Sequence, residues 1–154
     1  MVNPALVWTA YFAPLIACVL ITLFFLRSKN LSSLTAIAGI LTSFVCTLLI
    51  AKEIFAATPA LEVQQSLPWI NFDPLVINFG YLVNPLAIMM LLVVTGVGSA
   101  IFIYSRGYMA DDPSMPRFFA FLSLFAFSMI GIVLANNLIQ LFIFWELVGL
   151  SSYL

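Results

Sequence analysis

Long uncharged, apolar stretches alternate with short polar ones along this chain. Residues 1–26, 30–51, 74–105 and 118–145 contain no charged side chain. Each stretch reaches the roughly 20 apolar residues that a helix needs to cross a bilayer. In lipid the backbone must satisfy its own hydrogen bonds, so helices are favoured over exposed strands. The pattern predicts membrane spans near residues 6–26, 31–51, 85–104, 117–135 and 138–154.

Asparagine, serine and proline mark the predicted helix boundaries. Asn84 followed by Pro85 places a capping residue before a proline at the first helical position. Ser114 and Pro116 predict a similar start for the fourth span. Asn136-Asn137 predicts a turn between the fourth span and the fifth.

The connection formed by residues 52–84 is too long and too patterned for a bare linker. Trp69–Phe72 and Leu75–Phe79 are β-prone runs on either side of Asp73-Pro74, which is a turn signal. We therefore predict a small β-hairpin outside the bilayer. The hairpin could dock onto a neighbouring subunit or pack on the helices of its own chain, and the sequence favours neither.

The composition supports a protein that lives in lipid. Of the 154 residues, 64% are hydrophobic and 7% are charged, and the mean hydropathy is +1.19. Soluble domains carry about 25% charged residues, so a soluble enzyme, a nucleic-acid-binding protein and a disordered segment are excluded. What remains is an all-α integral membrane protein, with residues 1–154 forming one multi-span helical bundle.

The same composition argues against a metal or redox centre in this chain. It contains no histidine, which removes the imidazole ligands of haem and of many metals. Cys18 and Cys46 lie inside apolar runs, and we interpret them as small core residues rather than as a disulfide or metal pair. We expect no cofactor to be bound by this chain.

The basic residues predict the orientation of the chain. Arg27 and Lys29 lie in the first connection, and Arg106 and Arg117 flank the third, whereas Lys52 alone falls on the other side. Cytoplasmic loops carry the excess of Lys and Arg. This predicts an N-terminus and a hairpin outside, with the first and third loops in the cytoplasm.

Glu146 is the most informative residue for function. It lies eight positions past Leu138, which places it roughly 12 Å into the membrane at 1.5 Å per residue. An acid at that depth costs about 2.5–3.5 kcal/mol on the insertion scale, and such residues mostly mark ion or proton pathways. Gly149 and Tyr153 share its helix face, where they offer space for a helix or water and a hydroxyl for a hydrogen-bonded chain. The alternative is a structural acid bound to a neighbouring helix.

Other polar residues within the spans carry a weaker signal. The hydroxyl side chains could line a wet path or could bond back to the carbonyl four residues earlier. These residues are Thr22, Thr42, Ser43, Thr95, Ser99, Ser123 and Ser128. Asn136, Asn137 and Gln140 are expected at a membrane interface, without a special role.

Three runs together resemble a known family. They are Tyr104–Met109 (YSRGYM), Arg117–Phe125 (RFFAFLSLF) and Phe144–Leu154 (FWELVGLSSYL). The chain resembles subunit L, or chain 5, of the proton-pumping NADH:quinone oxidoreductase, respiratory complex I. The resemblance covers the chain in order and is most specific from about Asn84 to Leu154. The family usually has an acidic residue where Asn84 stands here, and we expect that difference to concern helix capping.

The resemblance implies a membrane-arm subunit that contributes to proton translocation coupled to NADH oxidation and quinone reduction. Glu146 matches the family's glutamate on the fifth helix, which pairs with a lysine on the seventh. NADH, FMN, the iron–sulfur clusters and quinone belong to other subunits. The implied partners are the other membrane-arm subunits, especially the adjacent antiporter-like one, in a bacterial inner membrane.

The resemblance also implies that the lysine and the later helices are absent from these 154 residues. We therefore expect an amino-terminal fragment of a longer antiporter-like subunit, inactive alone. The alternatives are the large subunit of a multi-subunit Na⁺/H⁺ antiporter, a membrane-bound hydrogenase relative and, in another class, a non-transporting membrane scaffold.

Overall fold

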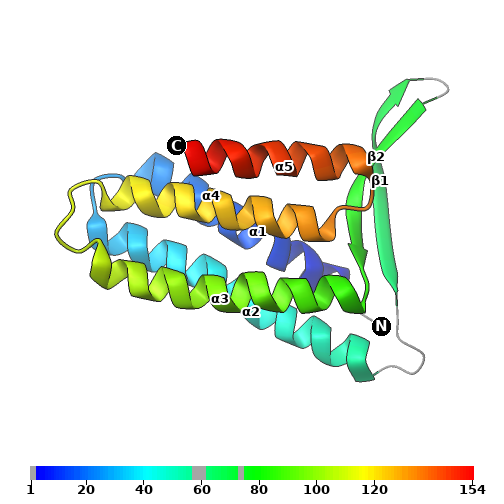
Figure 1. Ribbon diagram of the computed structural model, residues 1–154, viewed down its shortest axis with the longest axis horizontal. Helices are drawn as coiled ribbons and strands as arrows, with labels where there is room; N and C mark the ends of the chain where they lie inside the picture. Colours follow the sequence, from blue (N-terminus) through cyan, green and yellow to red (C-terminus); the bar gives the residue numbers. More distant parts are fainter. Residues whose placement is uncertain (1–2, 57–61, 73–74) are drawn as a thin grey trace.

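Five helices and one hairpin make up the computed structural model, which describes residues 3–56, 62–72 and 75–154. The helices lie alongside one another and the hairpin crosses one end of the bundle, near the N-terminus (Figure 1). In chain order the elements are α1 (Pro4–Leu20), its π-helical continuation η1 (Ile21–Phe25), α2 (Lys29–Ala56), β1 (Val63–Phe72), β2 (Leu75–Val83), α3 (Pro85–Tyr108), α4 (Met115–Leu134) and α5 (Leu138–Tyr153).

Within the described ranges, four helices are long and apolar enough to cross a membrane, namely α1 with η1, α2, α3 and α4. The fifth, α5, is apolar but has only 16 residues. This architecture confirms the predicted fold class, a multi-span helical bundle with a small hairpin. The hairpin separates α2 from α3, whereas the other successive helices are joined by short connections, as expected when antiparallel neighbours pack directly on each other.

The predicted boundaries need small corrections at the charged ends. Helix α2 continues past Lys52 to Ala56, and α3 continues past Arg106 to Tyr108. Long charged side chains can leave their stems on an apolar helix while the charged head reaches water, so a charge does not end a helix. The strands of the hairpin also extend further than the β-prone runs, because β1 already begins at Val63 and β2 continues to Val83. The predicted Asp73-Pro74 turn lies outside the described residues.

Of the two predicted capping residues, Asn84 caps its helix through its side chain and Ser114 does not. Asn84 Oδ1 accepts a hydrogen bond from the Ala87 N–H at 2.8 Å at the start of α3. Ser114 makes no such bond, because its backbone (φ −83°, ψ 2°) is outside the extended region from which a capping side chain reaches the first turn. Its own N–H instead donates to Asp112 Oδ1 at 2.6 Å. Helix α4 therefore begins at the predicted place, with Ser114 in the capping position and Pro116 in the first turn, but without a side-chain cap.

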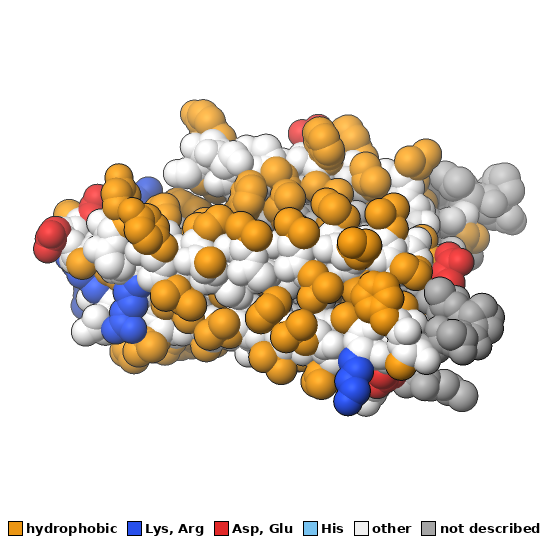
Figure 2. All heavy atoms as spheres, turned by 60° about the horizontal axis from the view of Figure 1, so that its bottom comes forward, with side chains coloured by type: hydrophobic (Ala, Val, Ile, Leu, Met, Phe, Trp, Pro, Cys, Tyr) orange, Lys and Arg blue, Asp and Glu red, His pale blue; other side chains and the backbone are white. Residues whose placement is uncertain are grey.

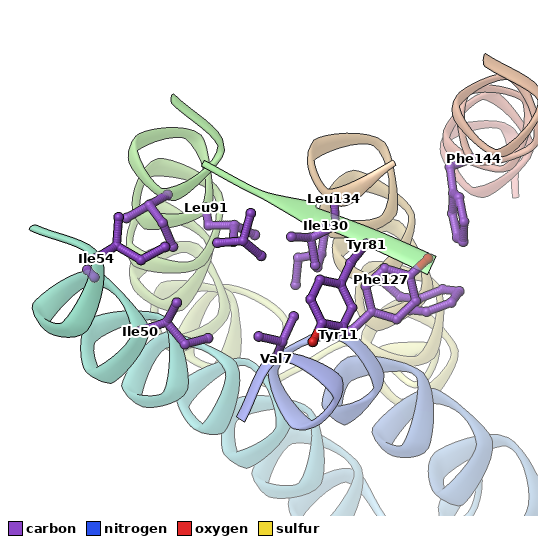
Figure 3. Packing of buried hydrophobic residues seen from close by; sticks show 13 residues of the cluster. Val7, Tyr11, Ile50, Ile54, Tyr81, Leu91, Phe127, Ile130, Leu134 and Phe144 are labelled. Carbon is purple, nitrogen blue, oxygen red and sulfur yellow. The ribbon is translucent and has the colours of Figure 1, made fainter. Parts of the chain in front are cut away.

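Aromatic rings from four elements meet near the hairpin end of the bundle. Tyr11 of α1, Tyr81 of β2, Phe127 of α4 and Phe144 of α5 converge there (Figure 3). The Tyr11 ring centroid lies 5.5 Å from that of Phe127 and 5.8 Å from that of Phe144, both edge-to-face. That geometry adds favourable quadrupole contacts to close packing. The cluster ties the hairpin and α5 to α1 and α4.

The hydroxyl side chains within the spans bond back to helix carbonyls. Such bonds, 2.6 to 3.3 Å long, are made by Thr22, Thr42, Ser43, Thr95, Ser99, Ser123 and Ser128. Ser43 Oγ also donates to the Ala10 carbonyl of α1 at 2.8 Å, which joins α1 to α2. Each hydroxyl is thus satisfied by a helix carbonyl, which favours the structural interpretation of these residues.

The bundle has an apolar flank and one basic end. Hydrophobic side chains cover most of the face shown in Figure 2, and most of the Lys and Arg side chains visible there gather at the end opposite the hairpin. We call this end the basic end, after Arg27, Lys29, Arg106 and Arg117. The Lys29 ammonium there donates to the Ala110 carbonyl at 3.2 Å, so the first and third connections contact each other.

Candidate functional site

Helix α5 carries the candidate site, and it has two distinct faces. Gln140, Phe144 and Ser151 are buried, at spacings of four and seven residues that return to the same side of a helix. This inward face is directed toward α4, along which α5 runs (Figure 1). Only the inward face is covered by the described residues.

The predicted site residues share the outward face of α5. Glu146 is exposed, and Tyr153 is 88% exposed. At Gly149 the position that a Cβ would occupy has no other side chain or neighbouring backbone within 4 Å in the described part of the chain. Phe142, one turn before the acid, is 62% exposed. The structure therefore groups Glu146, Gly149 and Tyr153 on one open surface, as the helical spacing predicted.

The inward face of α5 fits against α4 at Gly131, where the missing side chain leaves a notch in the α4 surface. The Phe144 ring lies so close to Gly131 of α4 that any Cβ there would overlap it. Glycine is needed here because of this close approach, not because of its backbone conformation. The contact sets how near the two helices come and which side of α5 faces α4.

Gln140 holds the start of α5 to the hairpin. Gln140 is 2% exposed, and its Nε2 donates to the Gly80 carbonyl at 2.8 Å. Its Oε1 accepts from the Gly80 N–H at 3.3 Å, so both backbone groups of this residue in β2 are paired. The Nε2 group also lies 3.5 Å from the Tyr11 hydroxyl of α1. A single side chain thus joins α5, β2 and α1.

Asn137 completes this attachment. Its Oδ1 accepts from the Gln140 N–H at 2.8 Å and so caps α5. Its Nδ2 donates to the Asn78 carbonyl of β2 at 2.7 Å. The sequence predicted an interface location without a role for Asn137 and Gln140. The signal that could have found them is the four-residue spacing that puts Gln140 on the same helix side as Phe144.

The hairpin itself is divided into a packed part and a projecting part. Gly80, Tyr81 and Val83 of β2 are buried against the bundle. Leu67 and Trp69 of β1 are more than half exposed, and in Figure 1 the hairpin continues past α5. An apolar groove of about 490 Å³ lies between this projecting part and α5. The packed part shows that the hairpin does pack on the helices of its own chain.

The fold and the site together describe a helical membrane protein with one acid on an open face of its last helix. A search of family profiles matches residues 69–119 to the family described as NADH-ubiquinone oxidoreductase (complex I), chain 5 N-terminus. The resemblance inferred from the sequence is therefore confirmed.

Curated relatives support the same family. The chain is 43% identical over 152 residues to NAD(P)H-quinone oxidoreductase subunit 5, chloroplastic, of Anthoceros angustus, covering 96% of this chain and 21% of the relative. It is 48% identical over 90 residues to NAD(P)H-quinone oxidoreductase chain 5 of Synechocystis sp., covering 58% of this chain and 13% of the relative. The chain thus spans about a fifth or less of the length of these relatives.

A solved structure shows the same fold. A chain of the Mrp complex from Dietzia sp. DQ12-45-1b matches with a TM-score of 0.66 over 96% of this chain and 14% of that chain. At 24% sequence identity this likeness concerns the fold alone. Together with the four span-length helices, the comparisons support an integral membrane protein.

Proposed function

We propose that this chain is part of a membrane-arm subunit of a proton-translocating NADH:quinone oxidoreductase, and that Glu146 carries protons in it. The observation that carries the proposal is the position of Glu146, eight residues into an apolar helix on the face left open by α4. The similarity to chain 5 of complex I supports the assignment of the complex. Electron transfer and its cofactors belong to other subunits in this proposal.

The chemistry asked of this chain is proton binding and release. An acid in an apolar helix is costly unless it serves a pathway or is paired. On the open face Glu146 is available to a partner outside the described helices, which in the family is a lysine on the seventh helix. Gly149 leaves room beside it, and Tyr153 adds a hydroxyl two turns along the helix. A relay needs its groups within hydrogen-bond distance, or one water apart. Seven residues of helix rise about 10.5 Å, so the proposal requires water or a partner side chain between Glu146 and Tyr153.

The test is Glu146→Gln in the full-length protein within its complex. Glutamine keeps the shape but cannot release a proton, so proton pumping into reconstituted vesicles should fall at least about tenfold, in line with the size of acid–base contributions. Quinone reduction should partly survive, because it occurs in other subunits.

The matched control is Glu53→Gln, the same change on α2, outside the apolar middle of its helix. Its pumping should stay within about twofold of the parent, as for changes outside a functional site. Undiminished pumping in Glu146→Gln would refute the role of the acid. Exchange of Na⁺ for H⁺ without quinone reduction would instead support the antiporter alternative.

For the orientation we propose that the hairpin and the N-terminus lie outside and the basic end lies in the cytoplasm. Four basic side chains at that end against Lys52 near the other support this arrangement. In a bacterial inner membrane, a cysteine placed at Ser66 should react with a membrane-impermeant maleimide added to intact cells, once Cys18 and Cys46 have been replaced by serine. Reaction only after the cells are lysed would reverse the assignment.

For the partners we propose the other membrane subunits of the complex, with the projecting part of the hairpin as one contact. The exposed Trp69 and Leu67 side chains support it. A photo-crosslinker at position 69 should join the chain to an adjacent membrane subunit, and capture of lipid alone would argue against that contact.

A further inference from the structure

We propose that Gln140 is a positioning residue for Glu146: its amide locks α5 to β2 at Gly80 and so fixes the rotation of α5 that presents the acid. This inference rests on the proposed function, because it assigns a second residue to the same site. Gln140 itself touches neither the acid nor a proton path in the described part of the chain.

The first step is that, in the described part of the chain, α5 is held along one side only. Among the helices it packs mainly along α4, whereas an inner helix of a bundle is held from several directions. Among the described residues, few specific contacts hold its rotation. They are the Phe144 ring in the Gly131 notch, the two bonds of Gln140 to Gly80, the Asn137 bond to the Asn78 carbonyl at the very start of α5, and the contacts of Phe144 and Gln140 with Tyr11.

The second step is that these contacts differ in kind. Phe144 is held by ring packing, which sets which side of α5 faces α4 and how close the two helices come. Apolar contacts have no fixed direction, so this packing leaves α5 free to turn by small angles. Gln140 is held by a paired donor and acceptor on a single residue of β2, which fixes both distance and direction. Both of its bonds are buried, and breaking them would leave the Gly80 N–H and carbonyl unpaired, a cost that resists rotation.

The third step is that the rotation sets where the carboxylate points. Glu146 lies six residues after Gln140, about 240° further round the helix at 100° per residue, so the two side chains leave the helix about 120° apart. A side-chain tip on a radius of about 5–6 Å moves about 2 Å when the helix turns by 20°. Because proton transfer requires groups within hydrogen-bond reach, such a displacement is enough to break a relay.

The experiment is Gln140→Met in the full-length protein within its complex. Methionine keeps the length of the side chain and loses both bonds to Gly80. The measurement is the number of protons pumped per quinone reduced in reconstituted vesicles. A purely structural defect reduces the amount of assembled complex and lowers both rates together, whereas a misplaced Glu146 lowers the ratio. We expect Gln140→Met to lower the number of protons pumped per quinone reduced by at least half as much as Glu146→Gln lowers it.

Two further variants keep the proposal testable. Gln140→Asn retains an amide near Gly80 but is one methylene shorter, so it disturbs assembly less and should lower the ratio as well. Trp8→Phe is the matched control, because the Trp8 Nε1–H donates to Gln65 Oε1 at 3.3 Å and holds the same hairpin to α1 instead of α5. It should leave the ratio unchanged.

The outcomes separate the two proposals. If Glu146→Gln leaves the ratio unchanged, the proposed function fails. If Glu146→Gln lowers it but an assembled Gln140 variant does not, only the positioning role fails. If Trp8→Phe lowers it as much as Gln140→Met, the effect comes from hairpin attachment in general, and the role of Gln140 through α5 is overturned.

Discussion

The two faces of α5 differ in how their polar and aromatic groups are held. On the inward face, Gln140 has partners on two other elements and Phe144 fills a notch in α4. On the outward face, Glu146 and Tyr153 are exposed, although the helix around them is as apolar as the longer spans. Structural polar groups in lipid need partners inside the protein. The contacts of the inward face hold α5 in the bundle. The polar groups of the outward face have no such contacts among the described residues, which is the arrangement expected of groups that act with a partner.

The largest expected difference between the two faces is the one between the variants Phe144→Ala and Phe142→Ala. Removing a buried ring should cost about 3–5 kcal/mol in the free energy of unfolding. Phe142 is 62% exposed, and its loss should cost less than about 1 kcal/mol. The measurement is denaturant unfolding of the full-length protein in detergent micelles. Equal losses would show that the outward face is packed as tightly as the inward one.

A smaller effect is expected for Asn137→Ala. It removes the cap of α5, worth about 1 kcal/mol, together with the donor to the Asn78 carbonyl. Asn84→Ala is the control, since it removes the cap of α3 alone. The same unfolding measurement should place Asn137→Ala lower in stability than Asn84→Ala. If the two variants were equally stable, the bond to β2 would contribute nothing.

The smallest effect is expected for Thr95→Ala. Its buried hydroxyl bonds the Leu91 carbonyl of its own helix at 2.7 Å, a bond that adds little to helix stability, so the loss should stay within about 0.5 kcal/mol. Ser43→Ala breaks a bond between α1 and α2 and should cost about 1 kcal/mol. Proton pumping by Thr95→Ala should match that of the parent protein. A pumping defect would instead favour the interpretation that this hydroxyl lines a water path.

Much of the architecture follows from local pattern. Charge-free stretches predict the spans because lipid excludes charge over a fixed thickness, and Asn84-Pro85 predicts a cap because both residues act within one turn. Side-chain partners far apart in sequence are harder to foresee. Ser114 looks like a cap until the backbone angles are known, and nothing local indicates that Gln140 meets Gly80, sixty residues earlier.

The residues of the candidate site stand out in the sequence for a different reason. Glu146 is conspicuous because an acid in an apolar helix is rare, and the helical repeat places Gly149 and Tyr153 beside it. Which side of α5 would face α4 depends on the Gly131 notch, and a glycine in a sequence does not say which ring will approach it. The positioning contacts therefore emerge only from the packed structure.

The pairing of Gly80 also determines how the hairpin can associate. The outer edge of β2 would otherwise offer its N–H and carbonyl groups to a further strand, and such edges promote association between chains. Amide side chains from the start of α5 occupy that edge at Asn78 and Gly80. A third strand is blocked there, so any strand added to this ribbon has to pair elsewhere along it.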